Sequence, residues 1–143
     1  MAEMITSTVV EPRHAPLQQT QIVRLTIVGF VTWLGVAFLL HYIGDLGAYQ
    51  GRGRLISYGI IALLTPSTLL ALMPLCGIAR NQIVLGTAWV VGIASVCDGL
   101  ALVWFTSIYG GTQTMIAGAG STLLWGVGAA CLVSFYVNRE PNS

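Results

Sequence analysis

The sequence contains very little charge, and this scarcity excludes most kinds of water-soluble protein. Only 8% of its 143 residues are charged, whereas soluble domains average about 25%. There is no lysine, and 6 arginines against 5 acidic residues leave a net charge of +1. So few charges cannot cover a water-exposed domain of this length. The small net charge also gives no reason to expect nucleic acid as a partner.

Cysteine and histidine are equally sparse. The 3 cysteines, Cys76, Cys97 and Cys131, form no C-x-x-C pair, and we expect them to act as small apolar packing residues. No G-x-S-x-G, H-E-x-x-H or phosphate-binding P-loop motif is present. We therefore predict no catalytic residues, no metal site and no cofactor. Haem, a pigment or quinone stay open, with His41 as the one histidine inside an apolar segment.

Long apolar stretches are what the sequence has in abundance, since 55% of its residues are hydrophobic. Four of them, at about 22–43, 55–75, 83–105 and 115–137, are each long enough to cross a bilayer as a helix. Short linkers make consecutive helices antiparallel. The sequence thus predicts an all-α, up-down transmembrane four-helix bundle over residues 22–137, with a flexible polar tail at 1–21 and a short tail at 138–143.

The arginines predict how the bundle sits in the membrane. Four spans place Arg13, Arg24, Arg80 and Arg139 on one side, and the other two arginines, at positions 52 and 54, on the opposite side. Positive loops favour the cytoplasm. We therefore expect a multi-pass protein of the bacterial inner membrane with both termini in the cytoplasm.

Asp98 is the only acidic residue inside any of the long apolar stretches. A charge near the bilayer centre costs roughly 2.5–3.5 kcal/mol, so such a residue is neutralised, paired or used. Ser95, three residues earlier, places it toward the bundle interior. Residues expected near its level, under a cap of Arg52 or Arg54, are His41, Tyr42, Tyr58 and Tyr109. This cluster is either a proton-titrating or ligand-binding pocket, or a structural hydrogen-bonded carboxyl beside an interfacial aromatic belt.

Small residues recur on two of the predicted helices. The third carries Gly92, Ser95 and Gly99, and the fourth carries Gly118, Thr122, Gly126 and Ala130. Small residues let helix backbones approach closely in lipid, so we expect these two helices to pack through them. In the second helix, Pro66 predicts a kink, with neighbouring hydroxyls available to the freed carbonyls.

Several short motifs together resemble an uncharacterised bacterial family of small four-helix integral membrane proteins, known as a domain of unknown function. They are Thr32-Trp33-Leu34, Pro66, Cys97-Asp98-Gly99-Leu100 with Trp104-Phe105 and Ile108-Tyr109, and Leu124-Trp125. The resemblance covers about residues 22–137. It implies the four-span fold and an acidic residue at position 98, and it implies no activity.

Three classes of function follow from these features. The first is a non-enzymatic accessory or assembly subunit that packs in the bilayer against larger membrane proteins or against itself. The second is a small proton-coupled transporter or ligand-binding membrane protein that uses Asp98. The third is a membrane enzyme acting on lipid or quinone head groups, which would need His41 to converge on Asp98.

Overall fold

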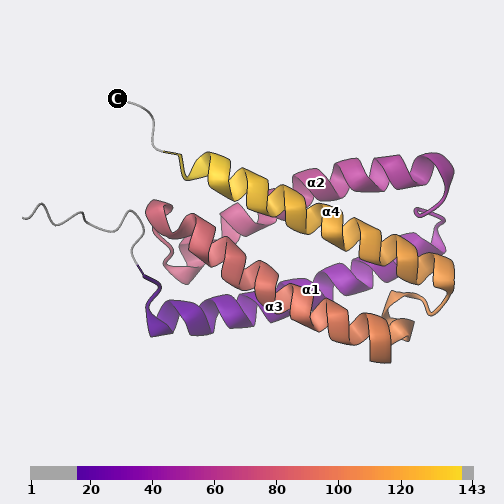
Figure 1. The fold of residues 1–143 in the computed structure, drawn as a ribbon, viewed down its shortest axis with the longest axis horizontal. Coiled ribbons are helices and arrows are strands. Elements are labelled where there is room, and N and C mark those ends of the chain that lie inside the picture. Colours follow the sequence, from indigo (N-terminus) through magenta and orange to yellow (C-terminus); the bar gives the residue numbers. More distant parts are fainter. Residues whose placement is uncertain (1–15, 140–143) are drawn as a thin grey trace, which may run out of the picture.

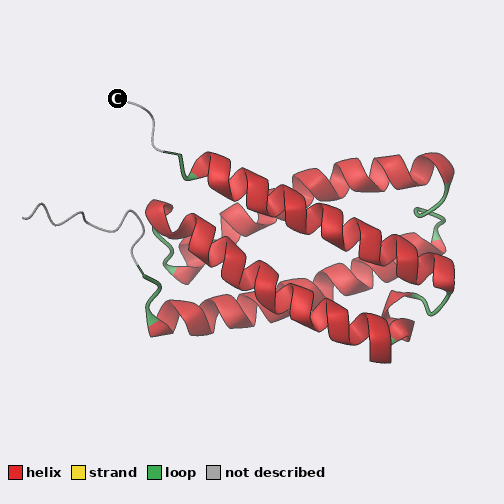
Figure 2. Cartoon of the chain, in the orientation of Figure 1, coloured by secondary structure: helices red, strands yellow, loops and turns green. Residues whose placement is uncertain are grey.

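The computed structural model describes residues 16–139, and every regular element in that range is a helix (Figure 2). Its long helices are α1 (Gln19–Asp45), α2 (Gly51–Leu72), α3 (Ile83–Trp104) and α4 (Gln113–Val137). Short 3-10 helices in the connections are η1 (Pro74–Cys76), η2 (Arg80–Gln82) and η3 (Thr106–Tyr109). The predicted all-α four-helix fold is therefore confirmed.

The surface of the bundle is as apolar as its interior. Phe38, Leu63 and Leu132 expose 64%, 73% and 73% of their area. Four segments of 25 to 27 residues are long and apolar enough to cross a membrane, because each residue adds 1.5 Å and the hydrocarbon core is roughly 30 Å thick. Acyl chains suit this exterior and water does not, so the chain is a multi-pass membrane protein.

The start of α1 is more ordered than the predicted tail. Gln21 is buried, and its Nε2 donates to the Gly77 carbonyl at 2.6 Å and to Gln82 Oε1 at 3.1 Å. Gln82 in turn donates to the Pro16 carbonyl at 3.0 Å. These amides tie the first turn of α1 to the α2–α3 connection, so residues 19–21 belong to the helix. Residues 1–15 of the predicted tail, with Arg13, and residues 140–143 lie outside the described range.

The helices pair differently from their order along the chain. α1 packs on α3, α2 packs on α4, and α3 also contacts α4, whereas α1 and α2 scarcely touch. Figure 1 shows the start of α1, the α2–α3 connection and the end of α4 at one end of the bundle. Consecutive helices are thus antiparallel as expected, but α1 and α2 are not packed on one another.

Tyr49, in the turn between α1 and α2, fixes this turn against α1 and α4. Its ring lies against Gly44 at the end of α1 and against Gly118 on α4. Its hydroxyl donates to the Leu40 carbonyl at 2.6 Å, and burial raises its pKa to about 12, so it remains a protonated donor. The turn is therefore anchored to α4, which places α2 beside α4.

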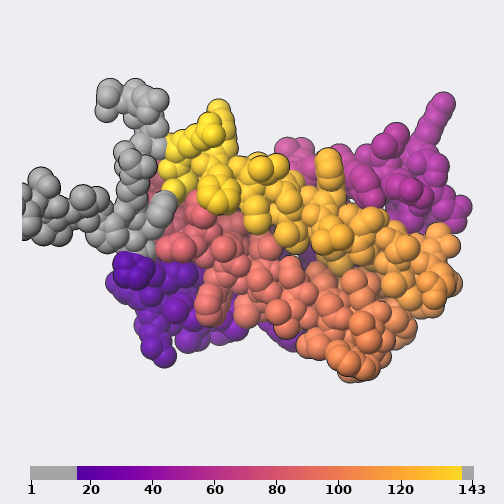
Figure 3. All heavy atoms as spheres, in the orientation of Figure 1, coloured from indigo at the N-terminus to yellow at the C-terminus, as the bar shows by residue number. Residues whose placement is uncertain are grey.

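On α4, Gly118 faces Tyr49 and Gly126 faces α2, and α3 is not among the nearest neighbours of either glycine. A side chain at Gly126 would come within 3.0 Å of Ile61 and 3.1 Å of the Thr65 hydroxyl. Thr122 and Ala130 are also buried. The side chains of α3 and α4 still meet along most of the face seen in Figure 3.

The small residues of α3 lie on its outer face instead. Gly92, Ser95 and Gly99 are exposed, and a side chain at either glycine would meet nothing within 4 Å. The expected packing of the two small-residue faces on each other is therefore not found. α3 instead turns Thr87, Val90, Asp98 and Ala101 inward, since these are its buried positions.

Replacing Gly118 by alanine should destabilise the bundle, because the added methyl group would overlap the Tyr49 ring. Overpacking of this kind costs about 1–3 kcal/mol. Gly128→Ala on the same helix is the matched control, since a side chain there meets nothing within 4 Å. Thermal denaturation in detergent, followed by circular dichroism, should show a lower midpoint for G118A alone. Equal midpoints would contradict the close packing of the Tyr49 ring against Gly118.

Candidate functional site

Asp98 is held inside the bundle by two neutral hydrogen-bond donors. Its side chain is 8% exposed. The Trp33 indole nitrogen on α1 donates to Oδ1 at 2.8 Å, and the Tyr109 hydroxyl at the end of η3 donates to the same oxygen. Hydrogen bonds to a buried carboxyl offset much of the cost of removing it from water. The contact joins three elements, α1, α3 and η3.

Tyr109 is fully buried and stays protonated over the physiological range. Burial raises its pKa, and the hydrogen bond and charge of the neighbouring Asp98 carboxyl raise it further. A protonated phenol donates to the ionised carboxyl that it faces. Tyr109 is therefore a fixed donor, and η3 holds it there through the turn that follows α3.

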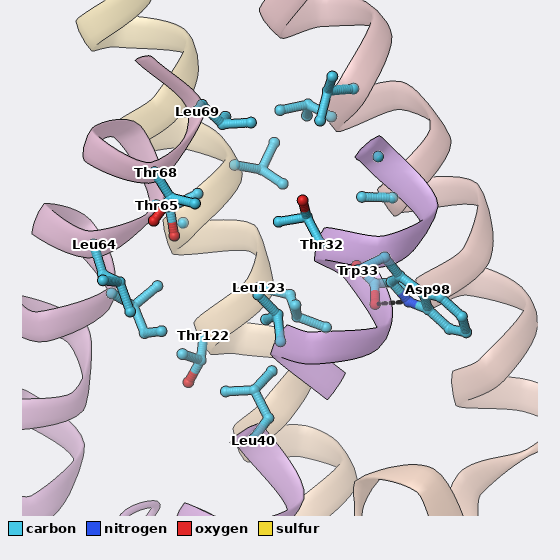
Figure 4. A pocket seen from close by; sticks show the side chains of 18 residues that line it. Thr32, Trp33, Leu40, Leu64, Thr65, Thr68, Leu69, Asp98, Thr122 and Leu123 are labelled. Atoms are coloured by element: carbon cyan, nitrogen blue, oxygen red, sulfur yellow. Dashed lines mark hydrogen bonds between the residues drawn. The ribbon is translucent and has the colours of Figure 1, made fainter. Parts of the chain in front are cut away.

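A cavity of about 110 Å³ lies between the four helices, with Asp98 in its wall (Figure 4). Leu40, on one side, belongs to the buried cluster around Tyr49, and Leu69 and Val90 belong to the cluster at the opposite end of the bundle. The cavity therefore occupies the level at which neither cluster fills the interior. α1 and α2 both line it without packing on each other.

The second oxygen of Asp98 accepts no hydrogen bond within the described range. Both hydrogen bonds to the carboxyl end on Oδ1, and among the described residues none ends on Oδ2. Among the described residues, Asn138 Oδ1 is the one fully enclosed side-chain nitrogen or oxygen atom without a hydrogen-bond partner. Oδ2 of Asp98 is therefore not fully enclosed. Oδ2 thus keeps accessible surface in a residue that lines the cavity.

Hydroxyl groups supply the other polar surface of the cavity. Within the described range, no hydrogen bond is formed by the hydroxyls of Thr32, Thr65 or Thr68, whereas Thr122 donates to the Gly118 carbonyl at 2.8 Å. Figure 4 shows Thr65 and Thr68 on the α2 side and Asp98 with Trp33 on the opposite side. A bound molecule could therefore meet a carboxyl oxygen at one wall and hydroxyls at the other.

α2 continues as a helix through Pro66. The Ser67 hydroxyl donates to the Leu63 carbonyl at 2.7 Å, one residue after the Ala62 carbonyl that the proline frees. Thr65 and Thr68 do not act in this way and face the cavity instead. Two hydroxyls of α2 are thus left for other partners.

Of the residues predicted to gather around Asp98, the structure brings only Tyr109 to it. His41 Nδ1 lies 3.1 Å from the Ile108 carbonyl, and its Nε2 lies 3.6 Å from Asp45. Tyr42 is 65% exposed. Tyr58 stacks on Trp125, with ring centroids 5.8 Å apart.

The predicted arginine cap is likewise not formed over Asp98. Arg54 donates to the Tyr49 carbonyl at 3.3 Å, and Arg52 is exposed. The predicted cluster therefore separates into an interior pair, Asp98 with Tyr109, and a group of residues nearer the membrane surface.

Trp33 is the functional neighbour that the sequence analysis missed, although it lies in a quoted motif. α1 and α3 run in the same direction, and Trp33 is 14 residues after Gln19 while Asp98 is 15 residues after Ile83. Equal rise along parallel helices places the two side chains at one level. His41, eight residues later, lies about 12 Å further along the helix axis.

The sequence matches no protein-family model, and comparisons with curated proteins and with solved structures give no significant match. The resemblance to small bacterial four-helix membrane proteins therefore stays a prediction.

Asp98→Asn should be tolerated far better than Asp98→Leu. The amide oxygen of asparagine can still accept from Trp33 and Tyr109, whereas leucine leaves both donors unsatisfied. Each unsatisfied buried donor costs about 1–3 kcal/mol. Unfolding midpoints in detergent should therefore fall clearly for D98L and little for D98N. Equal losses would mean that the bundle needs the acid itself at this position.

Proposed function

We propose that the protein is a non-enzymatic membrane protein that binds a small, mainly apolar molecule in the cavity between its four helices. The observation that carries this proposal is the accessible Oδ2 of Asp98 in the wall of an otherwise largely apolar cavity. Binding sites for small molecules commonly combine apolar walls with a few polar groups that orient the ligand. Asp98 would bind the single polar group of the molecule.

The size of the cavity limits what can bind. Its volume of about 110 Å³ is somewhat below the roughly 150 Å³ of an engineered protein cavity that binds benzene. The ligand is therefore compact, with the bulk of one small ring or a short branched chain. Binding against a membrane-embedded carboxyl is also the arrangement that a proton-coupled carrier would use.

The route into the cavity would run between α1 and α2. These helices line the cavity without packing on each other, and their outward residues, such as Phe38 and Leu63, are apolar. A lipophilic molecule dissolved in the bilayer would meet this side first. Entry from the bilayer would suit a mainly apolar ligand.

Benzyl alcohol should slow the reaction of N-ethylmaleimide with a cysteine that lines the cavity. The test uses Ala94→Cys, which lines the cavity, in a chain whose natural cysteines are replaced by alanine and which is held in lipid nanodiscs. A ring occupying the cavity should slow modification at position 94 at least threefold.

Gly128→Cys, on the exposed side of α4, is the matched control. It reports any change in modification that arises only because benzyl alcohol or N-ethylmaleimide dissolves in the lipid. Modification there should continue at its original rate. No protection at position 94, or the same protection at both positions, would overturn the proposed binding.

A second candidate function is an accessory or assembly subunit of a larger membrane complex, and the outer face of α3 favours it. Gly92, Ser95 and Gly99 lie exposed along this helix, where another transmembrane helix could approach closely. The partner in this role would be another membrane protein subunit.

Blue-native electrophoresis of membranes dissolved in mild detergent should then show the protein in a band well above its 15.2 kDa mass. Gly92→Leu combined with Gly99→Leu should shift it to a smaller species by blocking close approach. The same pair of changes at Gly35 and Gly59, which also meet no neighbour, is the control. Migration only as a monomer or homodimer would count against the accessory role.

We also propose that both termini face the cytoplasm of a bacterium and that the membrane is the inner one. Arg24, Arg80 and Arg139 lie at the end of the bundle that holds the start of α1 and the end of α4, and Arg52 and Arg54 lie at the other end. The larger number of arginines supports a cytoplasmic position for that end.

A further inference from the structure

We infer that the molecule bound in the cavity is an organic cation, a compact primary ammonium on a small apolar body, whose charged group contacts Oδ2 of Asp98. This inference rests on the proposed binding function and names the chemical class of its ligand. It follows from the charges around Asp98, from its unpartnered oxygen and from the hydroxyls that line the cavity.

Asp98 has no cationic partner in the described part of the chain. The one ion-pair contact there joins His41 and Asp45, near the bundle end. The partners of Asp98 are an indole and a phenol, which donate hydrogen bonds but carry no charge. An ionised carboxyl held this way remains uncompensated, at a cost that a ligand cation would offset.

The geometry directs that cation to a particular atom. Trp33 and Tyr109 both use Oδ1, so Oδ2 is the oxygen left for an incoming donor. An ammonium group offers three N–H donors. One can bind Oδ2, and the remainder can reach cavity hydroxyls such as that of Thr32, which lines the same cavity from α1.

An organic cation fits the surroundings better than a metal ion. Divalent metals take several carboxylate, imidazole or thiolate ligands. The described residues hold no group of three or more such side chains. The remaining walls are mostly aliphatic, from residues such as Leu64, Val91 and Val127, and they match the apolar body of a small amine.

Benzylamine and benzyl alcohol form a matched pair of probes, because they share one ring and differ in the charge of the polar group at neutral pH. Both are titrated against N-ethylmaleimide modification of the Ala94→Cys chain in nanodiscs, with Gly128→Cys as the lipid-facing control. Benzylamine should give half-maximal protection at a concentration at least about tenfold lower than benzyl alcohol. Adding Asp98→Asn should bring the two concentrations together, since the amide keeps the hydrogen bonds and removes the charge.

The outcomes separate the ligand class from the binding function. Equal protection by both probes, or stronger protection by the alcohol, would overturn the cation preference and leave cavity binding standing. Protection by neither would overturn both. A preference for benzylamine that persists in D98N would show that another group recognises the amine. If D98N does not accumulate in the membrane, the comparison of the two probes with Asp98 intact still tests whether the cavity prefers a cation.

Discussion

The carboxyl group of Asp98 needs polar partners in surroundings that supply few, and much of the interior is arranged around this need. Water is scarce in lipid, and the described residues place no cationic group against this carboxyl, so its donors come from other elements of the chain. Trp33 contributes from α1 and Tyr109 from η3. These bonds connect the α1–α3 pair to the turn that leads into α4, and they add a directional contact to the apolar packing at this level of the bundle.

A second constraint arises at the turn between α1 and α2. Tyr49 inserts its ring between Gly44 and Gly118, and the absence of side chains at these glycines makes the insertion possible. Because the turn is anchored on α4, α2 packs on α4 and leaves α1 to α3. The cavity lies between these two helix pairs.

Polar groups are placed unevenly in this protein. The glutamines at the start of α1 and in η2 satisfy one another and nearby carbonyls, and they close that end of the bundle. The cavity instead has a carboxyl oxygen and threonine hydroxyls without protein partners in the described range. Buried polar groups that serve stability alone are normally paired, and this contrast is the reason to look for a ligand at the cavity rather than at the glutamines.

The sequence by itself determined the four membrane helices, their antiparallel order and the burial of Asp98. These follow from the length of apolar runs and from the cost of charge in lipid, which are properties of single segments. Counting helical rise along α1 and α3 could also have found Trp33. The pairing of helices, the outward turn of Gly92 and Gly99, and the separation of His41 from Asp98 were decided only by tertiary structure. Apolar helices offer no polar stripe to mark their inner face, so contacts such as that of the Tyr49 ring with Gly44 and Gly118 become visible only in the folded chain.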